Sequence, residues 1–247
     1  MKKVIILNKK EGETPLECLE SFRLKHKEYK GVKMTYAGRL DPMASGVLVV
    51  LAGDEVYKKE KYLGLPKEYN FEILFGFATD TYDILGKVTR QDLVIKRRQE
   101  LEKSLKDNLK YFKGNFIQKY PVYSSRTVNG KPLFTYAREG VKLEAPEREV
   151  SVKSLKFTKL RVIGAPSLLK NLEKRIPRVQ GDFRQKEILK IWEKNLKKNK
   201  HKFFVGNFSI KCGSGTYVRG IANDLGVKMG VPALAFSIKR TKVGKYS

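Results

Sequence analysis

The stretch Met34–Glu55, MTYAGRLDPMASGVLVVLAGDE, joins a glycine-bounded turn to the most apolar run of the chain. The run Gly46–Leu51 predicts a buried strand, which would serve as a rigid support for the turn before it. Gly38 and Gly46 permit a tight turn and a close approach of the backbone. Asp41 sits in this turn, although basic residues outnumber acidic ones two to one. A carboxylate held there is suited to act as a nucleophile or general base, but aspartate before proline is also a common turn cap.

The charge balance is the most unusual bulk property of the chain. Its 247 residues carry 52 Lys and Arg against 26 Asp and Glu, a net charge of +26, and 41% of them are apolar. The apolar fraction argues against disorder, and the length suits one large domain or two small ones. Such a positive field attracts polyanions, so nucleic acid is the first predicted partner and an acidic membrane surface the second. A lysine-rich composition that only aids solubility is the remaining interpretation.

Cysteine and histidine usage argues against a metal or redox site. Cys18 and Cys212 are far apart and form no Cys-x-x-Cys motif, and His26 and His201 are the only histidines. We therefore expect no metal and a reducing compartment. The N-terminal MKKVIILNKKEG contains too short an apolar run for a secretory signal, and no run approaches the roughly 20 residues of a membrane-spanning helix. The sequence predicts a cytoplasmic protein without a membrane anchor.

Strand-like and helical segments are mixed along the chain without strict alternation. Segments rich in β-branched and aromatic residues predict strands at Val4–Leu7, Gly46–Leu51, Tyr69–Phe77, Glu149–Arg161 and Phe203–Lys211. Helices are predicted from Thr14, which begins a capping box, over Arg97–Phe112, whose leucines share one stripe, and over Thr216–Gly230. We therefore expect an α+β fold with a mixed or antiparallel sheet.

The segment from Pro166 to Phe203 is predicted to be a helical hairpin inserted between two strands. It contains two helical patterns, SLLKNLEKRI and FRQKEILKIWEKNLKKN, and carries 12 Lys and Arg against 4 Asp and Glu, a net charge of +8. Two interpretations stay open. Either the hairpin is an extra RNA clamp, or its stripe of Leu189, Trp192 and Leu196 packs on the body while its charged face is merely solvated.

The block PKEYNFEILFGFATDTYDILG, residues 66–86, combines a strand with an acidic turn. Tyr69 opens the strand, and its phenol is either a packed core group or a flat stacking surface with a polar tip. Asp80 and Asp83 follow the strand. Their spacing does not match a calcium loop, so turn capping is the preferred interpretation.

Two further blocks suit contacts with RNA. QKYPVYSSRTVNGKPLFTYAREG, residues 118–140, interleaves basic, aromatic and hydroxyl side chains around an Asn-Gly turn signal. This mixture is typical of single-stranded RNA binding and also of a surface hairpin. In KCGSGTYVRGIANDLG, residues 211–226, a glycine-flanked turn leads into a helix that Tyr217 and Arg219 begin. Arg219 is suited to bind a phosphate or to pair with a carboxylate.

In this order, the four blocks resemble the TruB family of tRNA pseudouridine synthases. The resemblance runs over nearly the whole chain, and its most specific parts are GRLDPMASGVL, KEYNFEILFGFATDTYDILG, YSSRTVNGKPLFTYAREG and GTYVRGIANDLG. It implies the pseudouridine synthase fold, with a mixed, mostly antiparallel central sheet flanked by helices. It also implies isomerisation of uridine to pseudouridine in the T-loop of tRNA, of the position 55 type, without a cofactor. In that reaction the N1–C1′ bond breaks, the uracil turns, and C5 is joined to C1′.

The resemblance also implies roles for individual residues. Asp41 matches the catalytic aspartate, and Arg219 matches its charge partner. Tyr69 matches the tyrosine that stacks on the flipped base, while Tyr217 and Ile238 match positions that line the pocket. The target uridine lies inside a structured loop, so it must be flipped out at a cost of roughly a few kcal/mol. Phosphate contacts of the basic surface offset this cost.

Some positions depart from the pattern of the family. Tyr36 stands where the family usually has a histidine that helps hold the opened T-loop by stacking, so we expect altered loop contacts rather than lost chemistry. Lys9-Lys10 replaces the usual Lys-Pro near the N-terminus. The chain stops soon after Arg240. We therefore expect residues 1–247 to be a single catalytic domain without the C-terminal accessory RNA-binding domain that is common in relatives.

The sequence thus predicts a monomeric synthase that recognises the T-stem and loop of tRNA without an obligatory protein partner. The main alternative is a non-catalytic RNA-binding protein or tRNA folding chaperone on the same fold. The presence of Asp41, Tyr69 and Arg219 argues against this as the only role. A synthase for ribosomal RNA or within a guide-RNA particle, and a basic membrane-surface protein, are further alternatives.

Overall fold

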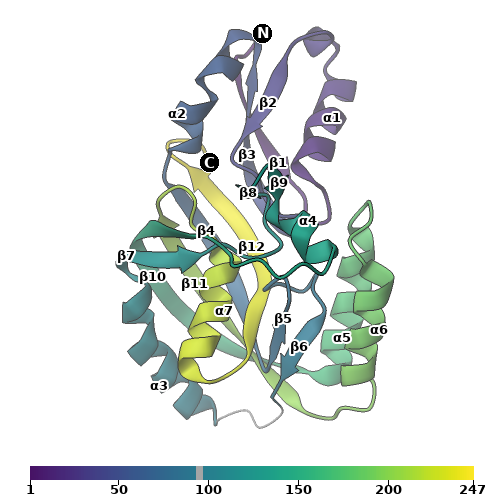
Figure 1. Cartoon of the computed structure of the whole chain (residues 1–247), viewed down its shortest axis with the longest axis vertical. Helices are drawn as coiled ribbons and strands as arrows, with labels where there is room; N and C mark the ends of the chain where they lie inside the picture. Colours follow the sequence, from purple (N-terminus) through teal and green to yellow (C-terminus); the bar gives the residue numbers. More distant parts are fainter. Residues whose placement is uncertain (93–96) are drawn as a thin grey trace.

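The computed structural model describes residues 1–92 and 97–247, and these residues form a long mixed sheet of eight strands (Figure 1). Its order is β1 (Val4–Lys9), β3 (Ala44–Ala52), β12 (Ala233–Val243), β4 (Lys67–Phe75), β11 (Lys202–Cys212), β10 (Glu147–Gly164) and β7 (Gly114–Lys119), with β2 (Met34–Ala37) paired to β3. Among these described strands, β3 and β12 pair in parallel and the other neighbours are antiparallel. The predicted α+β fold with a mostly antiparallel sheet is confirmed.

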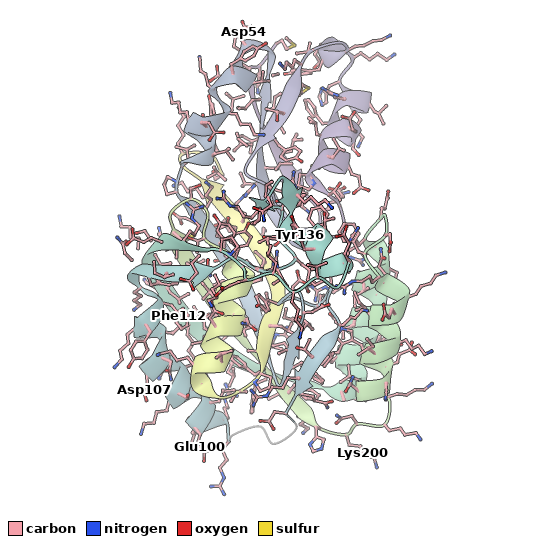
Figure 2. The ribbon with its side chains drawn as sticks, in the orientation of Figure 1. Asp54, Glu100, Asp107, Phe112, Tyr136 and Lys200 are labelled. Atoms are coloured by element: carbon pink, nitrogen blue, oxygen red, sulfur yellow. The ribbon has the colours of Figure 1, made fainter. Side chains whose placement is uncertain are left out.

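Helices and short hairpins surround this sheet. The α-helices are α1 (Pro15–Lys25), α2 (Lys59–Leu63), α3 (Arg98–Asn108), α4 (Leu133–Arg138), α5 (Ala165–Arg175), α6 (Gln185–Leu196) and α7 (Val218–Met229). Short 3-10 turns are η1 (Lys27–Tyr29), η2 (Gly53–Lys58), η3 (Leu109–Phe112) and η4 (Ile176–Arg178). Two small hairpins pair β5 (Phe77–Thr79) with β6 (Val88–Gln91) and β8 (Thr127–Val128) with β9 (Lys131–Pro132). Figure 2 labels Tyr136 on α4, in front of the central strands.

The apolar run of β3 is buried on both of its faces. Leu48 and Val50 belong to a core that includes side chains of α1, whereas Val49 and Leu51 belong to a core that includes Tyr62 of α2. A strand covered on both faces has no solvent-facing positions, which explains why the run lacks the polar alternation of a half-exposed strand. Each buried aliphatic side chain contributes roughly 1.5–3 kcal/mol, so the strand is a firm support.

Strand β4 also separates two cores. Phe71, Ile73 and Phe75 pack with side chains of α3 and α7, and Leu74 faces the core formed with α5 and α6. The predicted strand over Tyr69–Phe77 was wrong at its end. Gly76 has a φ of +106° and ends the strand. Its N–H donates to the carbonyl of Pro232, the next residue in the β12 register, but proline has no N–H to return the bond. Phe77 therefore begins the separate strand β5.

The three predicted helices are present with small differences at their ends. Thr14 caps α1 through the predicted capping box. The stripe predicted over 97–112 is buried, but α3 ends at Asn108 and a 3-10 turn carries the last two apolar residues into the same core. Helix α7 begins at Val218, one residue after Tyr217, and is closed by Gly230 with a φ of +72°. The sequence did not predict β2, β7 or β12.

The predicted helical hairpin is present as α5 and α6 on one side of the sheet (Figure 1). The hairpin packs on Phe77 and Phe203 of the body through a set of fully buried side chains, and these include Leu168, Leu172, Trp192 and Leu196. Of the predicted stripe, Trp192 and Leu196 are fully buried and Leu189 is partly buried against the same core, as the packing interpretation predicts. The RNA-clamp interpretation stays a prediction. Among the described residues no helix is long and apolar enough to cross a membrane.

Candidate active site

The turn that carries Asp41 is held at both ends by buried cations. Arg240, on β12 and only 1% exposed, donates from Nη2 to the Gly38 carbonyl at 2.9 Å and from Nε to a carbonyl of β3 at 2.7 Å. Lys9, which is fully buried at the end of β1, donates from Nζ to the Pro42 carbonyl at 3.3 Å. Charged donors form strong hydrogen bonds in a buried setting, so the backbone around Asp41 is fixed.

Gly46 lets β12 approach β3 directly beside this turn. The residue has a φ of +102°, and a Cβ atom at this position would overlap the carbonyl oxygen of Arg240. Glycine is therefore required both for its backbone conformation and for the close approach. In the parallel ladder that results, Ile238 faces Ala44, three residues after Asp41.

Arg219 connects Asp41 to two other segments from the first turn of α7. Its Nε donates to Asp41 Oδ2 at 2.9 Å, its Nη1 to the Thr81 carbonyl at 2.7 Å, and its Nη2 to the Tyr123 carbonyl at 3.0 Å. Burial alone would lower the pKa of Arg219, but the charges of Asp41 and Asp83 outweigh burial and raise that pKa. The predicted pairing of Arg219 with the turn carboxylate is thus seen directly, and a charged guanidinium faces Asp41.

Asp83 is a second carboxyl close to this pair, and the sequence did not identify it as a site residue. Its Oδ1 accepts hydrogen bonds from Thr81 Oγ1 at 2.6 Å and from the Leu85 N–H at 3.0 Å, so the turn-cap interpretation is correct. Burial raises the pKa of Asp83 to about 6, although Arg219 acts in the opposite direction. The side chain therefore changes charge near neutral pH, next to the arginine that holds Asp41.

Four of the predicted partners of Asp41 line one cavity with it. The cavity has a volume of about 280 Å³, and its walls include Asp41, Tyr69, Tyr217, Arg219 and Ile238. These residues come from the β2–β3 turn, β4, the start of α7 and β12, so the fold brings together positions that are far apart in sequence. A space of this size suits a small planar group such as a nucleobase.

Tyr69 and Tyr217, two of the tyrosines that line this cavity, keep neutral phenols at pH 7. Burial raises the pKa of Tyr69 and of Tyr217 above the ordinary value. Tyr217 is fixed by Gln118, whose side chain bonds both to its backbone N–H at 2.9 Å and to its carbonyl at 3.0 Å. The ring of Tyr120 packs edge-on against the ring of Tyr217, with centroids 5.6 Å apart. Tyr217 therefore presents a fixed aromatic ring to the cavity.

The other charged side chains on the cavity wall are basic. Arg39, Lys67, Arg148 and Arg240 line it together with Arg219, and among the described residues Asp41 is its one acid. Burial and, to a smaller extent, the charge of Arg240 lower the pKa of Lys67 to about 8. No group of three His, Cys, Asp or Glu residues suited to a metal is found within residues 1–92 and 97–247.

A second hollow adjoins the first at the Asp41–Arg219 pair. It has a volume of about 560 Å³ and shares both residues of the pair with the first cavity. Tyr36 lines this second hollow rather than the first, together with Arg138 of α4 and Arg184 of the hairpin. The structure therefore places Tyr36 beside Asp41 and Arg219 but in a different hollow from Tyr69, Tyr217 and Ile238.

Comparison with a family model identifies the chain. The model of the TruB family pseudouridylate synthase N-terminal domain matches residues 25–168, which include Tyr36, Asp41 and Tyr69. The chain belongs to the TruB family. Pseudouridylate synthases are isomerases, so the predicted enzyme class is confirmed together with the family.

Curated relatives and solved structures agree with this membership. The chain is 32% identical to tRNA pseudouridine synthase B of Lactobacillus johnsonii over 96% of its length and 67% of the relative's. It is 30% identical to the protein of the same name from Bacillus pumilus over 99% of its length and 66% of the relative's. Cbf5, in a crystal structure of a Cbf5-Nop10-Gar1 complex, matches with a TM-score of 0.57 at 17% identity. That match covers 99% of this chain but about half, 49%, of the solved chain, and it concerns the fold alone.

Proposed function

We propose that this protein isomerises uridine to pseudouridine in the T-loop of tRNA, at a site of the position 55 type. Relatives named tRNA pseudouridine synthase B and the net charge of +26 support a tRNA substrate. The observation that carries the proposal is the Asp41–Arg219 pair on the wall of an otherwise basic cavity. A carboxylate there repels phosphate, so mere RNA binding does not account for it, whereas catalysis does.

Asp41 is proposed to act on the sugar of the flipped uridine. During the reaction the N1–C1′ bond breaks, the uracil turns within the cavity, and a C5–C1′ bond forms. The C5 proton then leaves and N1 gains a proton, so the product is an isomer of the substrate. An attack on C1′ and a removal of the C2′ proton both need an ionised carboxylate. Arg219 fixes the direction of the carboxylate through its Nε–H hydrogen bond to Asp41 Oδ2.

Tyr69, Tyr217 and Ile238 are proposed to hold the flipped base. Two aromatic rings and an aliphatic side chain give the uracil apolar surfaces on which it can turn without leaving the cavity. Because burial raises the pKa of both phenols, they act as stacking surfaces and hydrogen-bond donors rather than as phenolate bases at pH 7.

The basic wall of the cavity is proposed to hold the phosphates on either side of the target. Lys67, Arg148 and Arg240 lie on this wall, and phosphate contacts offset the cost of flipping a base. A phosphate near Lys67 would raise its pKa from about 8 back toward the ordinary value, which strengthens the contact at neutral pH.

The second hollow is proposed to take the loop nucleotides that neighbour the target. Tyr36 lines it and offers an aromatic ring for stacking, as the family histidine does by resemblance.

We also propose that the exposed lysines of the hairpin contact the tRNA backbone, and these include Lys194, Lys197 and Lys198. Replacing all three by glutamine should weaken tRNA affinity without changing the rate at saturating tRNA. An unchanged tRNA affinity in this variant would reject the proposed contact between the hairpin and tRNA.

The target is tested with three RNAs that carry tritium at C5 of uridine. They are a full tRNA transcript, its isolated T-stem and loop, and its anticodon stem and loop. Because C5 loses its hydrogen only when it is joined to C1′, tritium release counts the pseudouridine formed. The purified protein alone, proposed to act as a monomer, should release tritium from the first two RNAs only. Release from the anticodon RNA would reject the T-loop target, and tight binding without release would favour a tRNA folding chaperone.

A further inference from the structure

Arg184 ties the hairpin to two segments of the body. The residue directly precedes α6, and its guanidinium donates from Nη1 to Asp80 Oδ2 at 2.7 Å and to the Tyr123 hydroxyl at 2.8 Å. A further bond from Nη2 reaches Asp80 Oδ1 at 3.3 Å, and the guanidinium lies 4.4 Å from the centroid of the Tyr123 ring. The side chains of Arg184 and Asp80 are only 19% and 20% exposed. Solvent therefore screens this pair weakly.

The same two segments also hold Arg219. Thr81, which follows Asp80, and Tyr123 provide the two carbonyls that accept from Nη1 and Nη2 of Arg219 at 2.7 and 3.0 Å. A guanidinium is planar and rigid, so these two bonds set the direction of its Nε–H. That N–H is the group that donates to Asp41 at 2.9 Å. A shift of either carbonyl would therefore turn Arg219 away from Asp41.

The hairpin has attachments to the body other than Arg184. The hairpin is already held by its buried apolar face, and Arg138 makes a separate bond from Nη2 to the Asp182 carbonyl at 2.8 Å. Arg184 moreover has a φ of +63°, a left-handed conformation that costs a non-glycine residue about 1 kcal/mol. The residue is kept in an unfavourable backbone conformation while its side chain reaches Asp80 and Tyr123.

We propose that Arg184 is a positioning residue for the Asp41–Arg219 pair. By tying the side chain of Asp80 to that of Tyr123, it fixes the two neighbouring carbonyls that orient Arg219. The hairpin then contributes to the orientation of the catalytic carboxylate and not only to RNA binding. The kinetic consequence of this proposal rests on the proposed function, whereas its geometric consequence, a fixed Arg219 Nε–H, does not.

The test compares Arg184→Gln and Arg184→Lys with the wild type and with Lys103→Gln. Lys103 is an exposed residue of α3, which lies far from α5 and α6 in Figure 1, so its variant removes one positive charge without touching either segment. Tyr123→Phe is a milder variant that removes one of the hydrogen bonds of Arg184 and leaves the carbonyl in place. Circular dichroism and a urea midpoint establish that each variant is folded.

The first readout is independent of the reaction. The signal of the Arg219 Nε–H is assigned in ¹⁵N NMR spectra by comparison with Arg219→Lys. The rate at which this hydrogen exchanges with solvent should rise at least about tenfold in Arg184→Gln. It should rise less in Arg184→Lys and in Tyr123→Phe. Lys103→Gln should leave it unchanged. Unchanged exchange in Arg184→Gln would overturn the proposal, even if activity falls.

The second readout is the single-turnover rate at saturating tRNA. Arg184→Gln should lower this rate on the order of tenfold, in addition to any loss of tRNA affinity that follows from the place of Arg184 on the wall of the second hollow. Arg184→Lys should restore part of the rate. Lost affinity with an unchanged saturated rate would overturn the proposal and make Arg184 an RNA contact. If exchange rises as expected but the wild type forms no pseudouridine, the link to Arg219 is supported and the proposed function fails instead.

Discussion

Arg219 Nε lies 2.9 Å from Asp41 Oδ2, and the two side chains differ sharply in exposure, at 3% for the arginine and 38% for the aspartate. The arginine is therefore a fixed part of the interior, while the carboxylate still faces the cavity. In the proposed reaction this arrangement orients the carboxylate before a substrate arrives, so little reorganisation would be needed during the chemical step. A rigid turn, anchored by Lys9 and Arg240, supports the same carboxylate from behind.

Replacing Arg219 by lysine should lower the single-turnover rate on the order of 100-fold, with tRNA affinity changed by no more than about threefold. Lysine keeps the charge, but it cannot hold Asp41 and two carbonyls in the geometry of a planar fork. The matched control is Arg161→Lys, because Arg161 pairs with Glu72 at a half-exposed site that lines neither cavity. A rate in Arg219→Lys equal to that of the control would contradict the role of the fork.

Replacing Asp83 by asparagine should change how stability depends on pH. The pKa of Asp83 is raised from 3.8 to about 6 in the folded protein. Between these two pH values the folded protein therefore binds more protons than the unfolded chain. The free energy of unfolding of the wild type falls as the pH rises through this window. Asparagine keeps an oxygen that can accept from Thr81 and Leu85 but carries no charge. The free energy of unfolding of Asp83→Asn, measured relative to the wild type, should therefore rise by up to about 3 kcal/mol between pH 4 and pH 7.

Urea unfolding at several pH values measures this difference. Asp107→Asn serves as a control, since Asp107 is exposed on α3. A constant difference in unfolding free energy between wild type and Asp83→Asn across the window would show that the carboxyl does not titrate as stated.

Replacing Tyr36 by alanine should weaken tRNA affinity about tenfold while the saturated rate stays near that of the wild type. Tyr36 lines the second hollow and not the cavity of the target base, so its loss removes a stacking surface without disturbing Asp41. Tyr36→His should keep affinity within about threefold, because histidine also stacks. Equilibrium binding and single-turnover rates check this, and a reduced rate with unchanged affinity would place Tyr36 in the chemical step instead.

Replacing Trp192 by alanine should destabilise the protein by about 3–5 kcal/mol, since its side chain is fully buried between the hairpin and Phe77. Lys190→Ala, at an exposed position of the same helix, should change the unfolding free energy by less than about 0.5 kcal/mol. Chemical denaturation measures both. If Trp192→Ala lowers the free energy of unfolding by less than about 1 kcal/mol, α6 is not an integral part of the core.

The sequence predicted those parts of the fold and site that depend on local patterns. The apolar run of β3, the capping box at Thr14 and the stripe over 97–112 each have a local signature, and all are present. The motif resemblance also placed Arg219 beside Asp41, and the hydrogen bond between them confirms the pairing.

The missed features depend on contacts between distant segments. Lys9 and Arg240 look like ordinary members of a lysine- and arginine-rich chain, and only the fold shows that they anchor the Asp41 turn. Asp83 has the local signature of a turn cap, and its proximity to Arg219 follows from the packing of α7 against the β4–β5 region. Strand β12 was missed because its sequence, ALAFSIKRTKV, alternates imperfectly, and its pairing partners lie far away in the chain.

The most direct test of the central claim is to incubate the purified protein with an unmodified tRNA transcript and to map pseudouridine at single-nucleotide resolution, with Asp41→Asn in parallel. The account predicts one product in the T-loop for the wild type. For Asp41→Asn it predicts a rate lower by roughly 10⁴-fold with nearly unchanged tRNA affinity. Turnover in Asp41→Asn comparable to the wild type would contradict the assignment of Asp41 as the catalytic residue.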